Sequence, residues 1–190
     1  MIRAFIAVDI PEDVRASVAE AQGCLKRGHF GVKLSWTKAE NWHLTLQFLG
    51  DVDESAIPAI SSALEGSVKQ HASFELKISG AGAFPNETRP RVLWVGCDDA
   101  EGKLQALAVS VQRAMKEFGF EPEQREFAAH LTLARMRVPR PDDALTRALD
   151  SIKNESFGTM RVDAVHLFES QLHPQGSIYR KLSTHALRAA

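Results

Sequence analysis

One four-residue motif, His-Leu-Thr-Leu, occurs at residues 43–46 and again at 130–133, nearly half of the 190-residue chain later. On a β-strand, alternate side chains share one face, about 6.6–6.8 Å apart. Each copy would therefore present its histidine and threonine on one face and its two leucines on the other. If the two strands lie near each other, two imidazoles and two hydroxyls line one groove.

Two imidazoles are suited to paired acid and base chemistry, because the ordinary histidine pKa lies near neutrality. Displacement of one oxygen at phosphorus needs this pairing: the attacking water loses a proton while the departing oxygen gains one on the opposite side. Nearby hydroxyls can bind the phosphoryl oxygens, whose charge grows in the transition state. We therefore assign His43 and His130 as candidate catalytic residues, and Thr45 and Thr132 as candidate phosphate-binding residues.

Other interpretations of the motif are weaker. A single His-x-Thr sequence is more often a solvated polar stripe, but a fold does not require that stripe to be repeated. A metal site needs three or four nitrogen, oxygen or sulfur ligands, and threonine is a poor zinc ligand. We therefore expect no metal ion and no cofactor.

Periodicity predicts alternating strands and helices without a low-complexity linker. Phe48 is expected to follow Leu44 and Leu46 on the buried face of its strand. The segment bracketed by Gly80 and Pro90 is expected to be a long loop, and a turn is expected over 173–176. The predicted strands are 2–9, 33–36, 43–49, 74–78, 91–95, 127–134, 160–168 and 179–187, and the predicted helices are 11–26, 53–69, 101–118 and 141–153.

The composition is that of a globular chain, with 44% hydrophobic and 25% charged residues. A formal net charge of −1 gives no global positive field, so a polyanionic partner would need a local basic patch. The two cysteines, Cys24 and Cys97, belong to no metal-binding run. The sequence shows neither the layout of a signal peptide nor an apolar run of about 18 residues, so we expect a cytoplasmic protein that does not bind a membrane. We also expect a monomer.

The sequence resembles a known family in five blocks: MIRAFIAVDIP, HLTLQFLGDV, RVLWVGCDD, FAAHLTLARMR and LFESQLHPQGSIYRKL. The most specific are the paired motifs, with FLG after the first and Ala-Arg after the second. The blocks look like those of the bacterial and archaeal RNA 2′,3′-cyclic phosphodiesterases, once named 2′-5′ RNA ligases, of the two-histidine phosphoesterase superfamily. The resemblance spans nearly the whole chain.

This resemblance implies one bilobal α+β domain over residues 1–190, with two antiparallel sheets facing each other across a cleft, helices outside and a pseudo-two-fold duplication. It implies metal-free opening of RNA 2′,3′-cyclic phosphate ends to 2′-phosphomonoesters. His43 would donate a proton to the departing 3′-oxygen, and His130 would activate water. Thr45 and Thr132 would orient the phosphate oxygens, and Arg135 would supply positive charge. A reversible 2′-5′ ligase and an RNA-end-binding module without turnover remain alternatives.

Strict alternation places Arg135 on the face opposite His130, so its role requires a bulge, a strand end or a side chain that curls over the edge. Other arginines surround the second motif and the Gly/Pro segment. They are either ordinary solvated charge or a track for RNA phosphates, whose binding would weaken with salt. These arginines are Arg89, Arg91, Arg125, Arg137 and Arg140.

Overall fold

A computed structural model describes residues 1–122, 127–173 and 176–190. Within these ranges the strands are β1 (Ile2–Asp9), β2 (Leu34–Trp36), β3 (His43–Val52), β4 (Phe74–Phe84), β5 (Val92–Asp98), β6 (His130–Met136), β7 (Ser156–Val162), β8 (Ala164–Gln171) and β9 (Ile178–Ala186). The α-helices are α1 (Glu12–Lys26), α2 (Ile57–Val68), α3 (Lys103–Lys116) and α4 (Asp143–Ile152). Short 3₁₀ turns at Ala39–Asn41 and Glu54–Ala56 precede β3 and α2.

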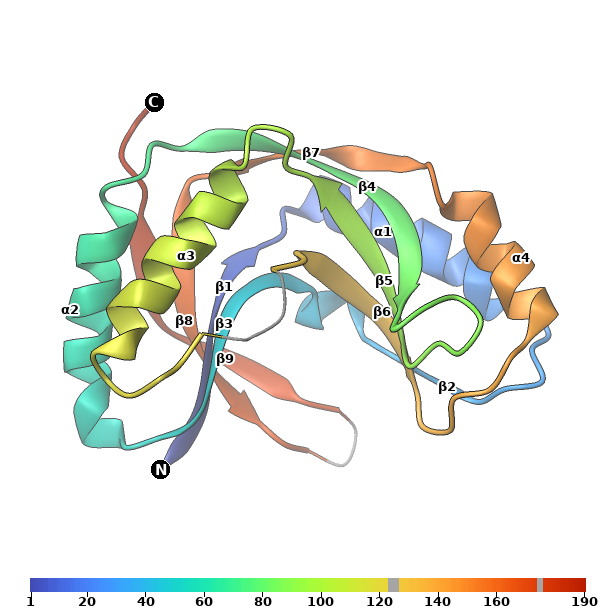
Figure 1. Ribbon diagram of the computed structural model, residues 1–190, viewed down its shortest axis with the longest axis horizontal. Helices are drawn as coiled ribbons and strands as arrows, with labels where there is room; N and C mark the ends of the chain where they lie inside the picture. Colours follow the sequence, from blue (N-terminus) through green and yellow to red (C-terminus); the bar gives the residue numbers. More distant parts are fainter. Residues whose placement is uncertain (123–126, 174–175) are drawn as a thin grey trace.

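The strands form two sheets in which every neighbouring pair is antiparallel (Figure 1). Sheet A has the order β3-β1-β8-β9, and sheet B has the order β2-β6-β5-β4-β7. Without the short edge strand β2, the two orders correspond strand for strand: β3 with β6, β1 with β5, β8 with β4 and β9 with β7. The two copies of the motif therefore begin equivalent strands, one in each sheet, and the predicted α+β architecture with a duplicated sheet is confirmed.

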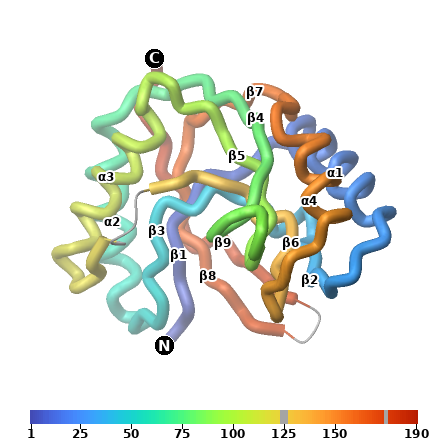
Figure 2. Tube along the Cα trace, turned by 45° about the vertical axis from the view of Figure 1, so that its right-hand side comes forward, coloured from blue at the N-terminus to red at the C-terminus, as the bar shows by residue number. Residues whose placement is uncertain are grey.

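The helices cover the outer sides of the sheets (Figure 2). Each sheet is covered by one helix from each half of the chain. Helices α2 and α3 pack on sheet A and on each other, whereas α1 and α4 pack on sheet B. Helix α3 packs on the sheet through one apolar face, because the apolar residues at helical spacing in its sequence are all buried. One hydrophobic core runs through both halves, from Ala4 to Leu187.

The predicted loop after residue 78 is partly wrong, because β4 continues to Phe84. Its glycines are needed for close packing within the sheet. A Cβ on Gly82 would lie 2.6 Å from the Trp94 ring of the neighbouring strand, so only glycine lets this indole lie across the sheet. Gly80 has φ +78° beside an irregularity in the β4–β5 pairing. These glycines belong to a strand and not to a loop.

The single strand predicted over 160–168 is also wrong. Two strands, β7 and β8, occupy this region, and only Asp163 separates them. Strand β7 is the edge of sheet B, while β8 pairs with β1 and β9 in sheet A. The apolar pattern runs through both strands without a turn signal, so periodicity could not show the change of sheet. The predicted turn over 173–176 includes residues 174 and 175, which lie outside the described residues, as does Arg125.

Candidate active site

Each motif strand carries a β-bulge at the same position. In β3, Thr45 lies opposite Ala7 but Gln47 lies opposite Ile6, so Leu46 is the extra residue. In β6, Thr132 lies opposite Trp94 and Ala134 opposite Leu93, which makes Leu133 the extra residue. Over the first seven residues both strands show the same order of buried and accessible side chains. The repeat therefore extends beyond four letters to a shared backbone irregularity.

The bulge shifts the alternation by one residue and changes which side chains face the cleft. Phe48 was expected in the core, but its side chain is 58% exposed and lines the cleft. Arg135 occupies the equivalent position of β6, is exposed, and lines the cleft together with Phe48 and Tyr179. The bulge that the role of Arg135 requires is therefore present.

A glutamine from a helix supports each bulge. Gln112 on α3 donates to the carbonyl oxygen of Leu46 at 3.2 Å. Gln22 on α1 donates to the carbonyl oxygens of Leu133 and Thr37, at 2.9 and 2.8 Å. Because these bonds satisfy the carbonyl of the extra residue, they hold the irregular backbone in place. Helix α3, from the second half of the chain, supports β3 of the first half, and α1, from the first half, supports β6 of the second, so the two halves brace each other.

His43 is half-buried among aromatic rings of sheet A. Its ring lies 4.6 Å from Phe5 and 5.2 Å from Tyr179, the latter edge-on. Desolvation by this burial lowers the pKa of His43 to about 4, against the opposing effects of a hydrogen bond to the backbone of Asn41 and the negative charge of Asp9. The charge of His130 lowers the pKa further, so the two imidazoles interact electrostatically across the cleft.

His130 has a related environment in sheet B. Its Nδ1 lies 2.7 Å from the carbonyl oxygen of Ala128, two residues earlier, just as His43 bonds to the backbone two residues before it. A carbonyl can only accept, so Nδ1 carries a hydrogen, and Nε2 is the basic nitrogen of the neutral ring. The Phe84 ring stands edge-on to His130 at 5.0 Å. Both histidines are thus oriented by the same backbone device.

Three adjoining pockets make up the cleft between the sheets. The His43 pocket, about 800 Å³, includes His43, Arg15, Lys38 and Tyr179 in its wall. The central pocket, about 260 Å³, shares Tyr179 with it and combines sheet A residues with Arg135 from sheet B. The third, the His130 pocket of about 320 Å³, holds His130 and Phe84 from sheet B and Thr45 from sheet A.

These pockets bring together four of the five predicted site residues: His43, His130, Thr45 and Arg135. Thr132 stands two residues after His130 on the same strand face and is half-buried. The backbone of Thr132 also joins the lobes, since its carbonyl oxygen accepts from Trp42 Nε1 at 3.0 Å.

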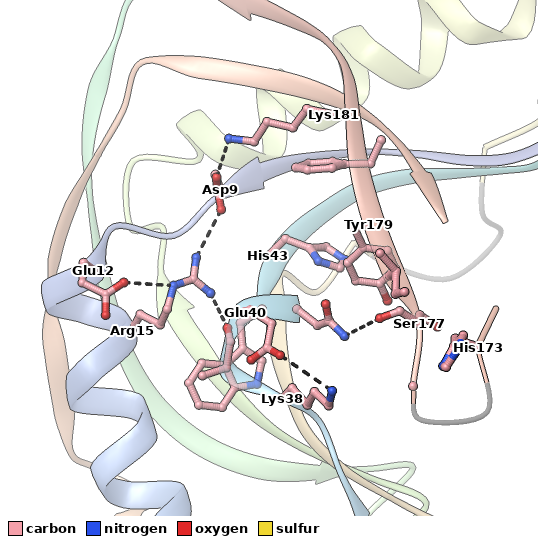
Figure 3. Close-up of a pocket in the computed structure, with 16 residues that line it drawn as sticks. Asp9, Glu12, Arg15, Lys38, Glu40, His43, His173, Ser177, Tyr179 and Lys181 are labelled. Atoms are coloured by element: carbon pink, nitrogen blue, oxygen red, sulfur yellow. Dashed lines mark hydrogen bonds and ion pairs between the residues drawn. The ribbon is translucent and has the colours of Figure 1, made fainter. Parts of the chain in front are cut away.

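A chain of charges lies beside His43 (Figure 3). Asp9 pairs with His43 in the β1–β3 register and bridges Lys181 at 2.6 Å and Arg15 at 3.3 Å. Arg15 also donates to the carbonyl oxygens of Ile10 and Ala39. The pKa of Asp9 is lowered: its burial acts upwards, but the hydrogen bond from Lys181 and the neighbouring cations outweigh it. Asp9 is therefore a fixed negative charge next to the imidazole.

Across the described part of the chain, no group of three or more His, Cys, Asp and Glu side chains could hold a metal ion. None of the described helices is both long and apolar enough to cross a membrane. What the cleft offers is two oriented imidazoles, a hydroxyl beside each and the guanidinium of Arg135. This set can move protons on two sides of a phosphoryl group and bind its oxygens.

The chain is similar to known proteins in sequence and in fold. The family model of the LigT-like phosphoesterases matches twice, over residues 8–94 and 95–179, with one His-Leu-Thr-Leu motif in each match. The chain belongs to the LigT-like phosphoesterase family. The boundary between the two matches falls within β5, so each match contains one of the two motif strands, β3 or β6.

Relatives and solved structures cover the chain almost completely. The RNA 2′,3′-cyclic phosphodiesterase of Methanothermobacter thermautotrophicus is 37% identical over 98% of this chain and 99% of its own length. That of Archaeoglobus fulgidus is 39% identical over 95% of this chain and 98% of its own. A crystal structure of a Thermus thermophilus protein superposes with TM-score 0.80 at 29% identity, covering 99% of both chains. Escherichia coli LigT with 3′-AMP shares the fold, with TM-score 0.76 at 24% identity over 98% of both chains.

Sequence reasoning did not identify the residues that support the two His-Leu-Thr-Leu strands or surround their histidines. Gln22 stands 21 residues before His43 and Gln112 stands 18 residues before His130, but each supports the strand of the other motif, so spacing alone did not indicate their role. Phe5 and Tyr179 carried no signal, because apolar rings on strands ordinarily indicate core. The bulges themselves could not be found by counting alternate residues.

Proposed function

We propose that this protein hydrolyses RNA 2′,3′-cyclic phosphodiester ends to 2′-phosphomonoesters, with His43 and His130 as the acid and base. The observation that carries the proposal is the duplication of the whole device: equivalent strands, identical bulges, and an imidazole held by the backbone two residues earlier. Relatives named RNA 2′,3′-cyclic phosphodiesterase support the same substrate. A single chain supplies both histidines, so we propose that a monomer acts as one unit, in the cytoplasm.

In the proposed reaction, His130 Nε2 takes a proton from water, and the water oxygen attacks phosphorus. The bond from phosphorus to the 3′-oxygen breaks in line with the attack, and His43 gives its proton to that oxygen. The product is a 2′-phosphomonoester, with one proton gained by His130 and one lost by His43. Thr45, Thr132 and Arg135 bind the phosphoryl oxygens as charge builds up on them.

The lowered pKa of His43 adds a condition to this scheme. With a pKa of about 4, the ring is neutral near pH 7 in the free protein. A bound phosphodiester anion favours the charged imidazolium and raises this pKa. His43 therefore takes up its catalytic proton from solvent when the substrate binds, and the ring needs no protonation in the empty cleft.

The test is incubation with an oligoribonucleotide that ends in a 2′,3′-cyclic phosphate, in EDTA, with identification of the product. We expect a 2′-monophosphate and a loss of about 10²–10⁴-fold in kcat for His43→Ala and for His130→Ala. His29→Ala, which removes an exposed imidazole outside the three pockets, is the control. Full activity in either active-site variant would refute the assignment, and a 3′-monophosphate product would reverse the leaving group.

A second candidate reaction is cleavage and formation of 2′-5′ linkages. The favouring observation is the His130 pocket, whose wall includes Phe84, Pro85, Val92 and the exposed Phe48. This apolar space lies on the side from which the nucleophile arrives, so a nucleoside with a free 5′-hydroxyl could replace water there. Cleavage of a 2′-5′-linked dinucleotide that is abolished by His130→Ala would support it, and no cleavage would limit the protein to hydrolysis of cyclic ends.

A further inference from the structure

Strands β2 and β6 pair at the edge of sheet B (Figures 1 and 2). A basic pocket lies at this edge, outside the three pockets of the cleft. We call it the edge pocket. It measures about 490 Å³, and its wall consists of Val32, Lys33, Ser35, Arg137, Val138 and Arg140. Three of these six side chains are cationic, and none is acidic.

The strand register places this pocket on the same face of sheet B as the cleft. Ser35 lies directly opposite Arg135, so their side chains share a face, whereas the neighbouring pair, Leu34 and Met136, points towards the core. Arg135 lines the central pocket together with residues of sheet A. Lys33 and Arg137 each stand two residues further along. The row of cations therefore continues outward from the site without turning a corner of the molecule.

The cations of the edge pocket are not neutralised within the described ranges. Lys33, Arg137 and Arg140 make no ion pair there, whereas Lys69, Lys103 and Lys116 on the other lobe each bridge a glutamate. The carboxylate nearest in sequence, Asp142, is engaged elsewhere. It accepts from the backbone N–H groups of Gly31 at 2.7 Å and Leu145 at 2.9 Å, and so caps α4.

Such a pocket can bind an anionic ligand. The position of the pocket relative to the active site indicates which kind of anion it binds. A cyclic phosphate held between the histidines already occupies Arg135, so the edge pocket lies too far along the strand for that same group. A chain with further phosphates could reach it. Val32 and the 68% exposed Val138 add apolar surface between the charges, which suits ribose or base more than an inorganic ion.

We propose that the edge pocket binds backbone phosphates of the RNA upstream of the cyclic end, through Lys33, Arg137 and Arg140. The proposal rests on the proposed function for the identity of the terminal group. It makes the protein selective for polynucleotide ends over free nucleoside cyclic phosphates. The edge pocket also explains how a protein of net charge −1 can bind RNA, because its cations are concentrated where the RNA leaves the cleft.

The test compares two substrates and two variants. The substrates are a nucleoside 2′,3′-cyclic monophosphate and an oligoribonucleotide of about ten nucleotides with the same terminal group. The first variant combines Lys33→Gln, Arg137→Gln and Arg140→Gln. The control combines Lys69→Gln, Lys103→Gln and Lys116→Gln, which removes the same charge from the helices that cover sheet A.

Salt dependence gives the expected size of the effect. Three phosphate contacts to a single strand predict a slope of about −2 in log affinity against log salt, hence a loss of about 20-fold between 50 and 200 mM. We expect kcat/KM for the oligonucleotide to fall about 20-fold more with the parent and the control than with the edge-pocket variant, which keeps only the salt dependence of the terminal phosphate site. Hydrolysis of the mononucleotide should be the same in all three proteins.

Equal salt dependence of the parent and the edge-pocket variant on the oligonucleotide would overturn the proposal, as would an equal loss in the control. A binding measurement separates this outcome from failure of the proposed function. Fluorescence anisotropy with a labelled oligoribonucleotide ending in a 3′-phosphate needs no turnover. Even if the parent hydrolysed neither substrate, weaker and less salt-dependent binding by the edge-pocket variant would support the RNA subsite, and unchanged binding would refute it.

Discussion

The burial of His43 predicts a pH-dependent cost to stability that a substitution should remove. The imidazole has a pKa of about 4 in the folded chain against an ordinary 6.5. Because the folded state disfavours the proton, this group costs nothing above pH 6.5, and the free energy of unfolding falls as pH drops from 6.5 to 4. At pH 4.5 the cost is about 2.5 kcal/mol, and at pH 7.5 it is about zero. His43→Asn abolishes this term.

Urea unfolding followed by tryptophan fluorescence at pH 7.5 and 4.5 measures the effect. The lost ring contacts with Phe5 and Tyr179 destabilise His43→Asn at both pH values, so the informative quantity is the change in its effect between them. We expect His43→Asn to be about 2.5 kcal/mol more favourable, relative to the parent, at pH 4.5 than at pH 7.5. The control His29→Asn removes an exposed imidazole and should change little. A change below about 0.5 kcal/mol in His43→Asn would show that burial does not disfavour its protonation.

Two further predictions concern the bulges and the guanidinium. Gln22→Leu leaves the Thr37 carbonyl without its glutamine donor and weakens the support of the Leu133 carbonyl, so it should cost about 1–3 kcal/mol of stability by urea unfolding and lower kcat. Gln112→Leu removes a single longer bond and should cost less; equal values for the two would contradict this ranking. Arg135→Gln should lower kcat for a nucleoside 2′,3′-cyclic phosphate by about 10²-fold, with Arg137→Gln as the matched control. Unchanged kcat in Arg135→Gln would remove this residue from the site.

The sequence was sufficient for those parts of the fold that depend on local pattern. The face of α3 and the strand character of both motifs follow from the spacing of apolar residues, and the structure confirms them. Alternation failed at Phe48, because one extra residue in β3 reverses the side chains that follow it, until a second irregularity after Phe48 restores the original alternation. The bulge could not be predicted from the sequence of β3 alone, because Gln112, a residue of α3 distant in sequence, supports it.

Glycine and strand boundaries failed for a different reason. Gly80 and Gly82 were interpreted as loop residues because glycine lacks strand propensity, yet Gly82 is required in β4 by the bulk of Trp94 on its neighbour. The break at Asp163 was invisible because buried apolar residues continue from β7 into β8 with no turn signal between them. Both errors depend on pairing between strands: Trp94 on the neighbouring strand requires Gly82, and β7 and β8 pair in different sheets. The sequence of a single strand does not show which strands it pairs with.

The two lobes share the same bulged motif strand but present different side chains to the cleft beyond the bulge. Before the bulge, the lobes are chemically identical, with a histidine and a threonine on the cleft face. Two residues beyond threonine, the buried position is Gln47 in one lobe and Ala134 in the other, and the next side chain returned to the cleft is Phe48 or Arg135. A symmetric acid and base can thus face one phosphorus atom while an aromatic ring and a cation make the cleft directional. The edge pocket extends this asymmetry, because its cations continue the row that Arg135 begins.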